Sequence, residues 1–458
     1  MRLHKIVTLW RQGNDQEPAL MTPLRRIYNA ALGAAGIEVL GMAIGYAGQI
    51  LLARWLGSSG YGVFAWVSAL VMFLAIPCQL GLSMLILRDV TPTRIRTDAG
   101  AVRGLLRRAY QIAIIISALV CIGGVGLDRL LAEDIVYRGP LATGLIALPF
   151  VVAGALHAGT SRAFGRIVMV KLLGDISRPS LLIVGASSAI YVGGQASPSL
   201  ALALFAGAAA LAALAQYAAL RRIRPSTLDK TAPRYASRQW IKTAAPFALV
   251  AAIDVCMRQI DLLMCGLFLP AADVGRYAVA ARLATLVTLS MVAINMLAAP
   301  TYAELSQRGD LQNLQRTVRR LAHAMFWPAL AVSAGLVVAG PIILAAFGPE
   351  FGTAYAPLVM LVAGALVNVG AGSVGYLANM TGHQWWTVRI QGASVLLNVV
   401  LNAVLIPTYG LIGAAMATTF SVCLANIGLH LVVTRRVGVH ASIIHASLWP
   451  KQARQTEA

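Results

Sequence analysis

The sequence predicts an all-α polytopic membrane protein with about twelve transmembrane helices, arranged as two six-helix halves. Of its 458 residues, 58% are apolar and only 12% are charged, and the mean hydropathy is +0.73. This composition excludes a water-soluble fold. The apolar residues form runs of about 20 or more, the length that crosses a hydrocarbon core of about 30 Å. The basic residues gather in alternate loops, as expected for a chain that crosses the membrane repeatedly.

Apolar runs separated by polar or basic segments define the predicted spans. They cover residues 29–53, 62–87, 109–127, 141–161, 179–194, 199–220, 244–269, 275–298, 325–347, 355–380, 385–406 and 410–433. The fifth span is short unless the segment from Arg166 onward joins it as an interfacial or broken helix, which Gly174 and Pro179 permit.

The distribution of basic residues predicts cytoplasmic N- and C-termini. With this orientation most of the 37 Lys and Arg residues fall on the cytoplasmic side, where positive charge is retained during insertion. The net charge of +20 is therefore mainly a topology signal, and we expect no nucleic-acid partner. The N-terminal segment is basic but has no apolar stretch of its own, so we expect no cleaved signal peptide.

A basic loop divides the chain into two lobes of six spans each. The predicted parts are the cytoplasmic segment 1–28, the N-lobe 29–220, the cytoplasmic loop 221–243, the C-lobe 244–434 and the cytoplasmic tail 435–458. A short repeat supports the division, because Tyr-Gly-Val-Phe-Ala at 61–65 is similar to Val-Gly-Arg-Tyr-Ala at 274–278. In transporters built from such repeats, the site lies between the halves.

Ionisable residues inside spans are costly and often functional. Glu38 lies in the first span on one helical face with Gly41, Gly45 and Gln49. Its carboxylate is a candidate for coupling transport to protons or Na⁺. The alternative is a glycine-lined helix contact in which Glu38 bonds to a neighbour.

The seventh span carries Asp254, Arg258 and Asp261 on one face. Either the three neutralise one another, or Arg258 meets a phosphate in a cavity while the aspartates tune it. Arg282 in the eighth span has no acid within four residues. It is a candidate anion contact, the alternative being that it snorkels outward on its long stem.

The eleventh span has a polar stripe at helical spacing, formed by Gln391, Ser394, Asn398 and Asn402. These amides and hydroxyls either line a path for sugar hydroxyls or hydrogen-bond between helices, and we favour the second. The candidate cavity residues are therefore Arg258, Arg282, Asp254, Asp261, Gln391, Asn398 and Asn402, with Glu38 as the ion-coupling candidate.

No enzyme, cofactor or metal signature accompanies these residues. The sequence has no P-loop, no nucleophile elbow and no His/Cys cluster with metal-ligand spacing. The five cysteines fall inside apolar spans without pairing patterns, so we expect no disulfides. The loops predicted outside are all too short to fold as a catalytic domain.

Several stretches resemble the polysaccharide biosynthesis proteins, the Wzx-like oligosaccharide flippases. They are QILLARWLGSSGYGVFA at 49–65, QLGLS at 79–83, RQIDLL at 258–263, VGRYA at 274–278, FGPEF at 347–351 and PTYGLIGAA at 407–415. Each motif is loose, but their order and spacing together are fairly specific, and they extend over nearly the whole span region.

The resemblance implies the multidrug/oligosaccharidyl-lipid/polysaccharide exporter fold, in which two six-helix lobes surround a central cavity. It also implies a bacterial inner-membrane flippase whose substrate is undecaprenyl diphosphate carrying a sugar repeat unit. The membrane lipid and the polymerase or export components of polysaccharide synthesis are the partners implied. The glycan could belong to O-antigen lipopolysaccharide, capsule, exopolysaccharide or another polymer.

Two alternatives remain open. A cation-coupled multidrug exporter of the same superfold would use an acidic or apolar cavity, for which Asp254, Asp261 and Glu38 are available. A membrane polysaccharide polymerase or ligase is less favoured, because no sizeable outside loop is present.

Overall fold

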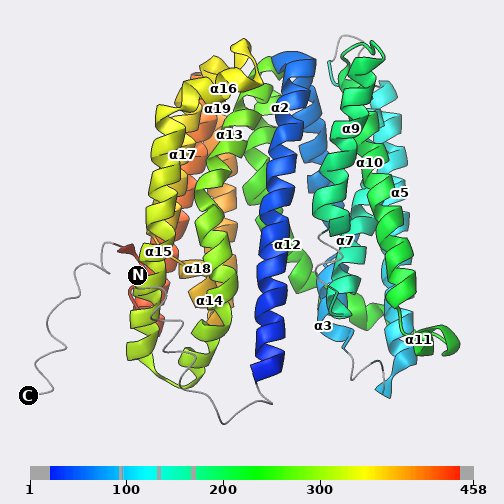
Figure 1. Ribbon diagram of the computed structural model, residues 1–458, viewed down its shortest axis with the longest axis vertical. Helices are drawn as coiled ribbons and strands as arrows, with labels where there is room; N and C mark the ends of the chain where they lie inside the picture. The colour runs from blue at the N-terminus through cyan, green and yellow to red at the C-terminus, as the bar shows by residue number, and fades with distance from the viewer. Residues whose placement is uncertain (1–20, 92–94, 96, 131–135, 167–171, 444–458) are drawn as a thin grey trace, which may run out of the picture.

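The computed structural model describes residues 21–91, 95, 97–130, 136–166 and 172–443. Within this part of the chain, the side chains of 21–35, 38, 39, 229, 296, 297, 299 and 300 are not described. All regular structure in the described residues is helical, and most helices run along the long axis of the molecule (Figure 1). The all-α fold class predicted from the sequence is confirmed.

The N-terminal helices form one group. They are α2 (Met21–Gln79), α3 (Leu82–Asp89), α5 (Ala99–Leu130), α6 (Pro140–Leu145), α7 (Leu148–Ala163), the π-helix η1 (Leu172–Ile176), α9 (Ser177–Tyr191) and α10 (Pro198–Ile223). We refer to them as the N-terminal group. A short helix, α11 (Ser226–Lys230), follows, and α12 (Ser237–Phe268) leads to the second group.

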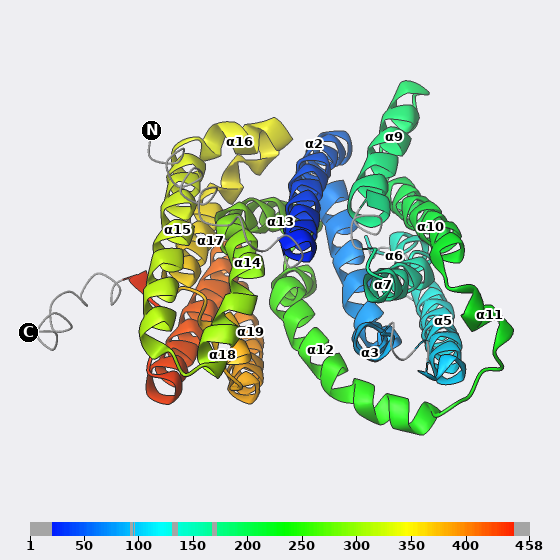
Figure 2. The same cartoon turned by 60° about the horizontal axis from the view of Figure 1, so that its bottom comes forward.

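The C-terminal group contains the remaining helices. They are α13 (Ala271–Thr285), the 3-10 helix η2 (Leu286–Thr288), α14 (Leu289–Gln307), α15 (Leu311–Val338), α16 (Gly340–Phe347), the 3-10 helix η3 (Pro349–Ala354), α17 (Tyr355–Gly370), α18 (Val374–Met380), α19 (Gln384–Val432) and the π-helix η4 (Val433–Val437). Figure 2 shows the two groups side by side, with α12 curving beneath the N-terminal group toward the boundary between the two.

In the described part of the chain, eight helical stretches are long and apolar enough to cross a membrane. Two of these stretches each contain two predicted spans: α2 is broken at Gly57 (φ 68°), and α19 is broken at Gly410 (φ 58°). Both breaks use a left-handed φ that glycine adopts without steric cost. Gly57 lies between the predicted spans 29–53 and 62–87, and Gly410 is the first residue of the predicted span 410–433. The number of twelve crossings stays a prediction.

The fifth predicted span begins earlier than its apolar run. The π-helix η1 continues directly into α9, so Asp175 and Arg178 lie on this helical segment close to its π-helical start. Likewise α12 begins at Ser237, inside the segment 221–243 expected to be a loop. Its early turns bury Trp240 and Ala244 and pack against α3, which explains why a polar stretch is helical here.

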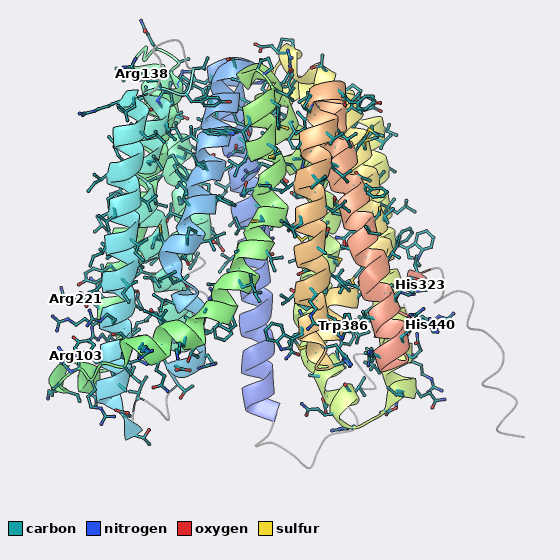
Figure 3. The ribbon with its side chains drawn as sticks, turned by 180° about the vertical axis from the view of Figure 1, so that it is seen from behind. Arg103, Arg138, Arg221, His323, Trp386 and His440 are labelled. Carbon is teal, nitrogen blue, oxygen red and sulfur yellow. The ribbon has the colours of Figure 1, made fainter. Side chains whose placement is uncertain are left out.

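The two groups meet where α2 contacts α13, and we call this contact the seam. The helix α12 bridges the groups, since it contacts α2 and α3 on one side and α19 on the other. Arg138 lies at one end of the molecule, whereas Arg103, Arg221, His323, Trp386 and His440 lie toward the other (Figure 3). We name these the Arg138 end and the Arg103 end.

The orientation predicted from basic residues can be tested at the two ends. In a variant without native cysteines, we expect Arg138→Cys to react with a membrane-impermeant maleimide on intact cells. Lys230→Cys, in exposed α11, should react only after lysis, because positive loops stay cytoplasmic. The reverse labelling pattern would invert the topology.

Candidate functional site

At the Arg138 end the seam is closed by backbone contact between the two repeat motifs. A methyl group added at Gly62 would lie 1.8 Å from the Ala271 carbonyl oxygen and 2.8 Å from the Gly275 amide nitrogen. One added at Gly275 would lie 2.2 Å from the Ser58 carbonyl oxygen. The two glycines of the sequence repeat therefore face each other. Without side chains between them, α2 and α13 approach as closely as small residues allow in membrane helix pairs.

Polar contacts surround this closure. The Glu350 carboxylate accepts a hydrogen bond from the Ser58 amide at 3.0 Å and another from the Ser58 hydroxyl. Arg54 Nε donates to the Ala346 carbonyl oxygen at 2.6 Å, and Arg276 Nε donates to the Glu350 carbonyl oxygen at 3.0 Å. These bonds tie the α2 break to the α16–η3 segment. We call them the end latch.

The middle of the seam is lined by hydroxyl and amide groups. The Tyr46 hydroxyl donates to the Arg282 carbonyl oxygen at 2.6 Å and lies 3.1 Å from the Thr285 hydroxyl. On the α2 side the Tyr61 hydroxyl donates to Gln49 Oε1 at 2.7 Å. Polar groups of this kind inside a bundle offer hydrogen-bond partners to a polar solute.

Two guanidinium groups from different helix groups approach each other near the seam. Arg178 of α9 and Arg282 of α13 are near enough for their charges to interact, and Asp175 of η1 is the acid beside Arg178. Arg282 also interacts electrostatically with the hydroxyls of Tyr46 and Tyr61 on α2. Its side chain is exposed. Guanidinium groups are planar, permanently charged and donate bidentate bonds to phosphate, so two of them within electrostatic range can contribute to an anion site.

The sequence did not single out Arg178 as a site residue, because it lies just before the predicted span 179–194. The missing information is the π-helix η1, which extends the fifth helix upstream of its apolar run. Single-turn π-helices frequently mark functional positions. The combination of Gly174, Asp175 and Arg178 before Pro179 was the available clue.

The three charged residues of α12 separate into two sets. Arg258 pairs with Asp254, and both side chains are exposed. Asp261 instead is buried and accepts a hydrogen bond from Asn402 Nδ2 at 2.7 Å. The same Asn402 nitrogen donates to Asn398 Oδ1 at 3.0 Å. Asp261, Asn398 and Asn402 thus link α12 to α19, away from the Arg178–Arg282 pair.

The remaining candidates have varied surroundings. Gln391 is half-buried, and Ser394 of the same stripe donates to the Ser421 carbonyl oxygen at 2.8 Å, a bond between the two arms of α19. The Glu38 side chain lies outside the described residues. On the same helical face as Glu38, a methyl group added at Gly41 would lie 2.9 Å from the Asp175 carbonyl oxygen, whereas one added at Gly45 would lie in open space.

Metal and redox chemistry find no support in the part of the chain that the structure describes. It contains no group of three or more His, Cys, Asp or Glu residues arranged to hold a metal ion. The five cysteines are free.

Solved structures with the same fold define the class. The chain matches a MATE family multidrug transporter of the MOP superfamily in an inward-facing conformation, with a TM-score of 0.72 and 14% identity over 93% of this chain and all of the other. It also matches the lipid II flippase MurJ in an inward closed conformation, with a TM-score of 0.72 and 12% identity over 88% of this chain and 87% of the other. The protein is therefore a multi-pass membrane protein with the fold of this transporter superfamily.

Sequence comparison gives the family. The family model described as polysaccharide biosynthesis protein matches residues 51–356, and the chain belongs to that family. A curated relative is the probable flippase AglR of Haloferax volcanii, 27% identical over 416 residues that cover 86% of this chain and 80% of the relative. The family resemblance in the sequence motifs is confirmed.

The glycine contact at the seam makes a specific prediction. We expect Gly62→Ala to weaken closure at the Arg138 end and destabilise the protein by about 1 to 3 kcal/mol, since the added methyl group meets backbone atoms. A cysteine pair at Ser58 and Glu350, in a chain lacking native cysteines, should then cross-link less efficiently.

Gly45→Ala is the matched control, because it adds the same methyl group to the same helix in open space. It should leave both cross-linking and thermal stability unchanged. Equal cross-linking in the Gly62→Ala variant and the parent chain would show that the glycine contact does not hold this end closed.

Proposed function

We propose that the chain is a flippase that moves an undecaprenyl-diphosphate-linked oligosaccharide from the cytoplasmic to the outer leaflet of a bacterial cytoplasmic membrane. Membership of the polysaccharide biosynthesis family supports a role in polysaccharide synthesis. Similarity to the probable flippase AglR supports lipid transfer between leaflets as the activity. The observation that carries the proposal is that Arg178 on α9 and Arg282 on α13, which belong to different helix groups, lie close enough for their charges to interact. A diphosphate between them would neutralise their mutual repulsion and join the two helix groups.

The mechanism we propose is alternating access. In the predicted orientation the Arg138 end faces away from the cytoplasm, and the glycine contact and end latch keep it shut. The diphosphate and glycan enter from the cytoplasmic side and bind Arg178 and Arg282, with Tyr46, Gln49 and Thr285 available to hydroxyl groups. The prenyl chain stays in lipid. Rocking of one group against the other then breaks the end latch and opens the opposite side.

Chemical steps are not required of the protein in this mechanism, so no enzymatic activity is proposed. Arg258, Asp254 and Gln391 remain candidate contacts for the substrate. For Asp261, Asn398 and Asn402 the buried network between α12 and α19 favours helix packing.

A multidrug exporter of the same fold is the second candidate. The 14% identity to a multidrug transporter supports the common fold alone. A cationic drug would need unpaired acids, but Asp254 is paired with Arg258 and Asp261 is buried against Asn402. The basic pair at the seam favours an anionic substrate instead.

The decisive test is the lipid-linked oligosaccharide pool in a strain lacking the gene. We expect the pool to accumulate on the cytoplasmic leaflet and to clear when the intact gene is returned. A normal leaflet distribution combined with altered dye efflux would move the assignment to drug export.

Single arginine variants should identify the anion site. We expect Arg178→Ala and Arg282→Ala each to lower leaflet transfer about tenfold or more at normal protein abundance, since a hydrogen bond to a charged group is worth about 1.5–3 kcal/mol. Arg258→Ala should also impair transfer, whereas exposed Arg129→Ala at the end of α5 is the control and should not. Wild-type transfer by both Arg178→Ala and Arg282→Ala would remove them from the proposed site.

Ion coupling is a separate prediction. If the Glu38 carboxylate binds the coupling ion, Glu38→Gln should abolish the dependence of transfer on the ion gradient while leaving the protein folded. Transfer should be measured in proteoliposomes with and without an imposed proton or Na⁺ gradient. An unchanged gradient response would assign Glu38 to helix packing.

A further inference from the structure

A second basic site lies within the N-terminal group, away from the seam. A cavity of about 330 Å³ adjoins the end latch, and another of about 300 Å³ opens between α5, α7 and α10. The second cavity is lined by Arg103, Arg107, Arg221 and Arg224 together with Leu106, Tyr110, His157, Thr160, Phe164, Tyr217 and Leu220. None of these lining residues belongs to α2 or α13, and none is acidic. We call this cavity the α5–α10 pocket.

The interior of the pocket is a built polar site. His157 is only 5% exposed, and its Nδ1 has no hydrogen-bond partner among the described residues. The imidazole ring is held between two tyrosines, with centroids 5.3 Å from Tyr110 and 6.0 Å from Tyr217. The ring of this buried histidine is part of the lining of the cavity.

The rim of the pocket is cationic. Arg107 and Arg221 are exposed, and Arg221 lies over the Tyr217 ring at 5.9 Å. Arg103 is held in place by a 2.6 Å hydrogen bond from Nη1 to the Thr231 carbonyl oxygen. Figure 3 shows Arg103 and Arg221 on the same side of the molecule, toward the Arg103 end. Several arginines around a cavity without acids favour a phosphate-bearing anion, because guanidinium matches phosphate geometry.

The surface above the pocket is apolar and suits lipid chains. On α10, Leu211, Leu214 and Tyr217 recur at helical spacing, and each is at least half exposed. On α5, Ile115, Leu119 and Ile122 form a similar exposed face. A phospholipid with its headgroup in the pocket could extend its acyl chains along these faces. Basic pockets between helices near a membrane surface bind anionic headgroups in this manner.

We infer that the α5–α10 pocket binds the phosphate headgroup of an anionic membrane lipid, as a site separate from the proposed translocation path. The lipid would belong to the leaflet at the Arg103 end. Its phosphate would contact Arg107 and Arg221 at the rim of the pocket. The site does not depend on the flippase assignment, since it lies inside one helix group.

Native mass spectrometry of the full-length chain, released from nanodiscs of mixed phosphatidylglycerol and phosphatidylcholine, tests the inference. We expect the wild-type protein to retain phosphatidylglycerol in preference to phosphatidylcholine. The double variant Arg107→Gln/Arg221→Gln should retain at least about tenfold less phosphatidylglycerol than the wild type, because charge-assisted hydrogen bonds are strong.

The control is Arg316→Gln/Arg320→Gln, which removes the same charge from exposed positions of α15 in the other helix group. It should retain phosphatidylglycerol like the wild type. An equal loss in this control, or no loss in the pocket variant, would overturn the site. Displacement of the lipid by millimolar inorganic phosphate would assign the pocket to a soluble phosphate compound and overturn the lipid assignment.

Discussion

The backbone contact between Gly62 and Gly275 fixes how the two helix groups meet. In a bilayer, helices gain little from hiding apolar surface, because the lipid chains are equally apolar. Close approach of backbones is then the main source of attraction. Because neither glycine has a side chain, Ser58 and Ala271 can lie against the opposing helix. This approach brings the α2 break within reach of Glu350 and allows the end latch to form.

The contacts at the closed end are suited to breaking as well as forming. Besides the glycine contact, they include the hydrogen bonds from Arg54 to Ala346 and from Ser58 to Glu350, and an edge-on ring contact between Tyr61 and Phe351 at 6.1 Å. When that end opens, water can form hydrogen bonds with the donors and acceptors that lose their partners. The bridging helix α12 behaves differently. It contains Pro246 and packs on both α3 and α19, so it can keep the groups connected while the seam changes.

Much of the fold was predictable because lipid imposes simple rules on a sequence. Span length and charge location are set by the thickness of the bilayer and by insertion, and the helices of the structure follow the predicted apolar runs. The glycines at 57 and 410 interrupt what would otherwise be two very long helices. The repeat at 61–65 and 274–278 was also visible, although its face-to-face glycines required coordinates.

The candidate site was less predictable, because helical spacing identifies a face but not the neighbour it meets. Asp254, Arg258 and Asp261 share a face of α12, yet only Asp261 reaches Asn402 of α19, while the other two pair at the surface. Arg178 lies just before the apolar run of the predicted span 179–194, so the sequence did not single it out as a site residue. The structure places it on α9, directly after η1 and within electrostatic range of Arg282.

The two basic sites differ in what an anion bound there can do. At the seam, Arg178 and Arg282 come from different helix groups, so the energy of an anion between them depends on the distance between the groups. Such a ligand binds one arrangement better than another and can shift the conformational equilibrium. In the α5–α10 pocket all ligating residues belong to helices that pack on one another. The energy of an anion bound there does not depend in the same way on the distance between the two helix groups. Arginine clusters with similar chemistry can therefore serve substrate movement at one site and lipid attachment at the other.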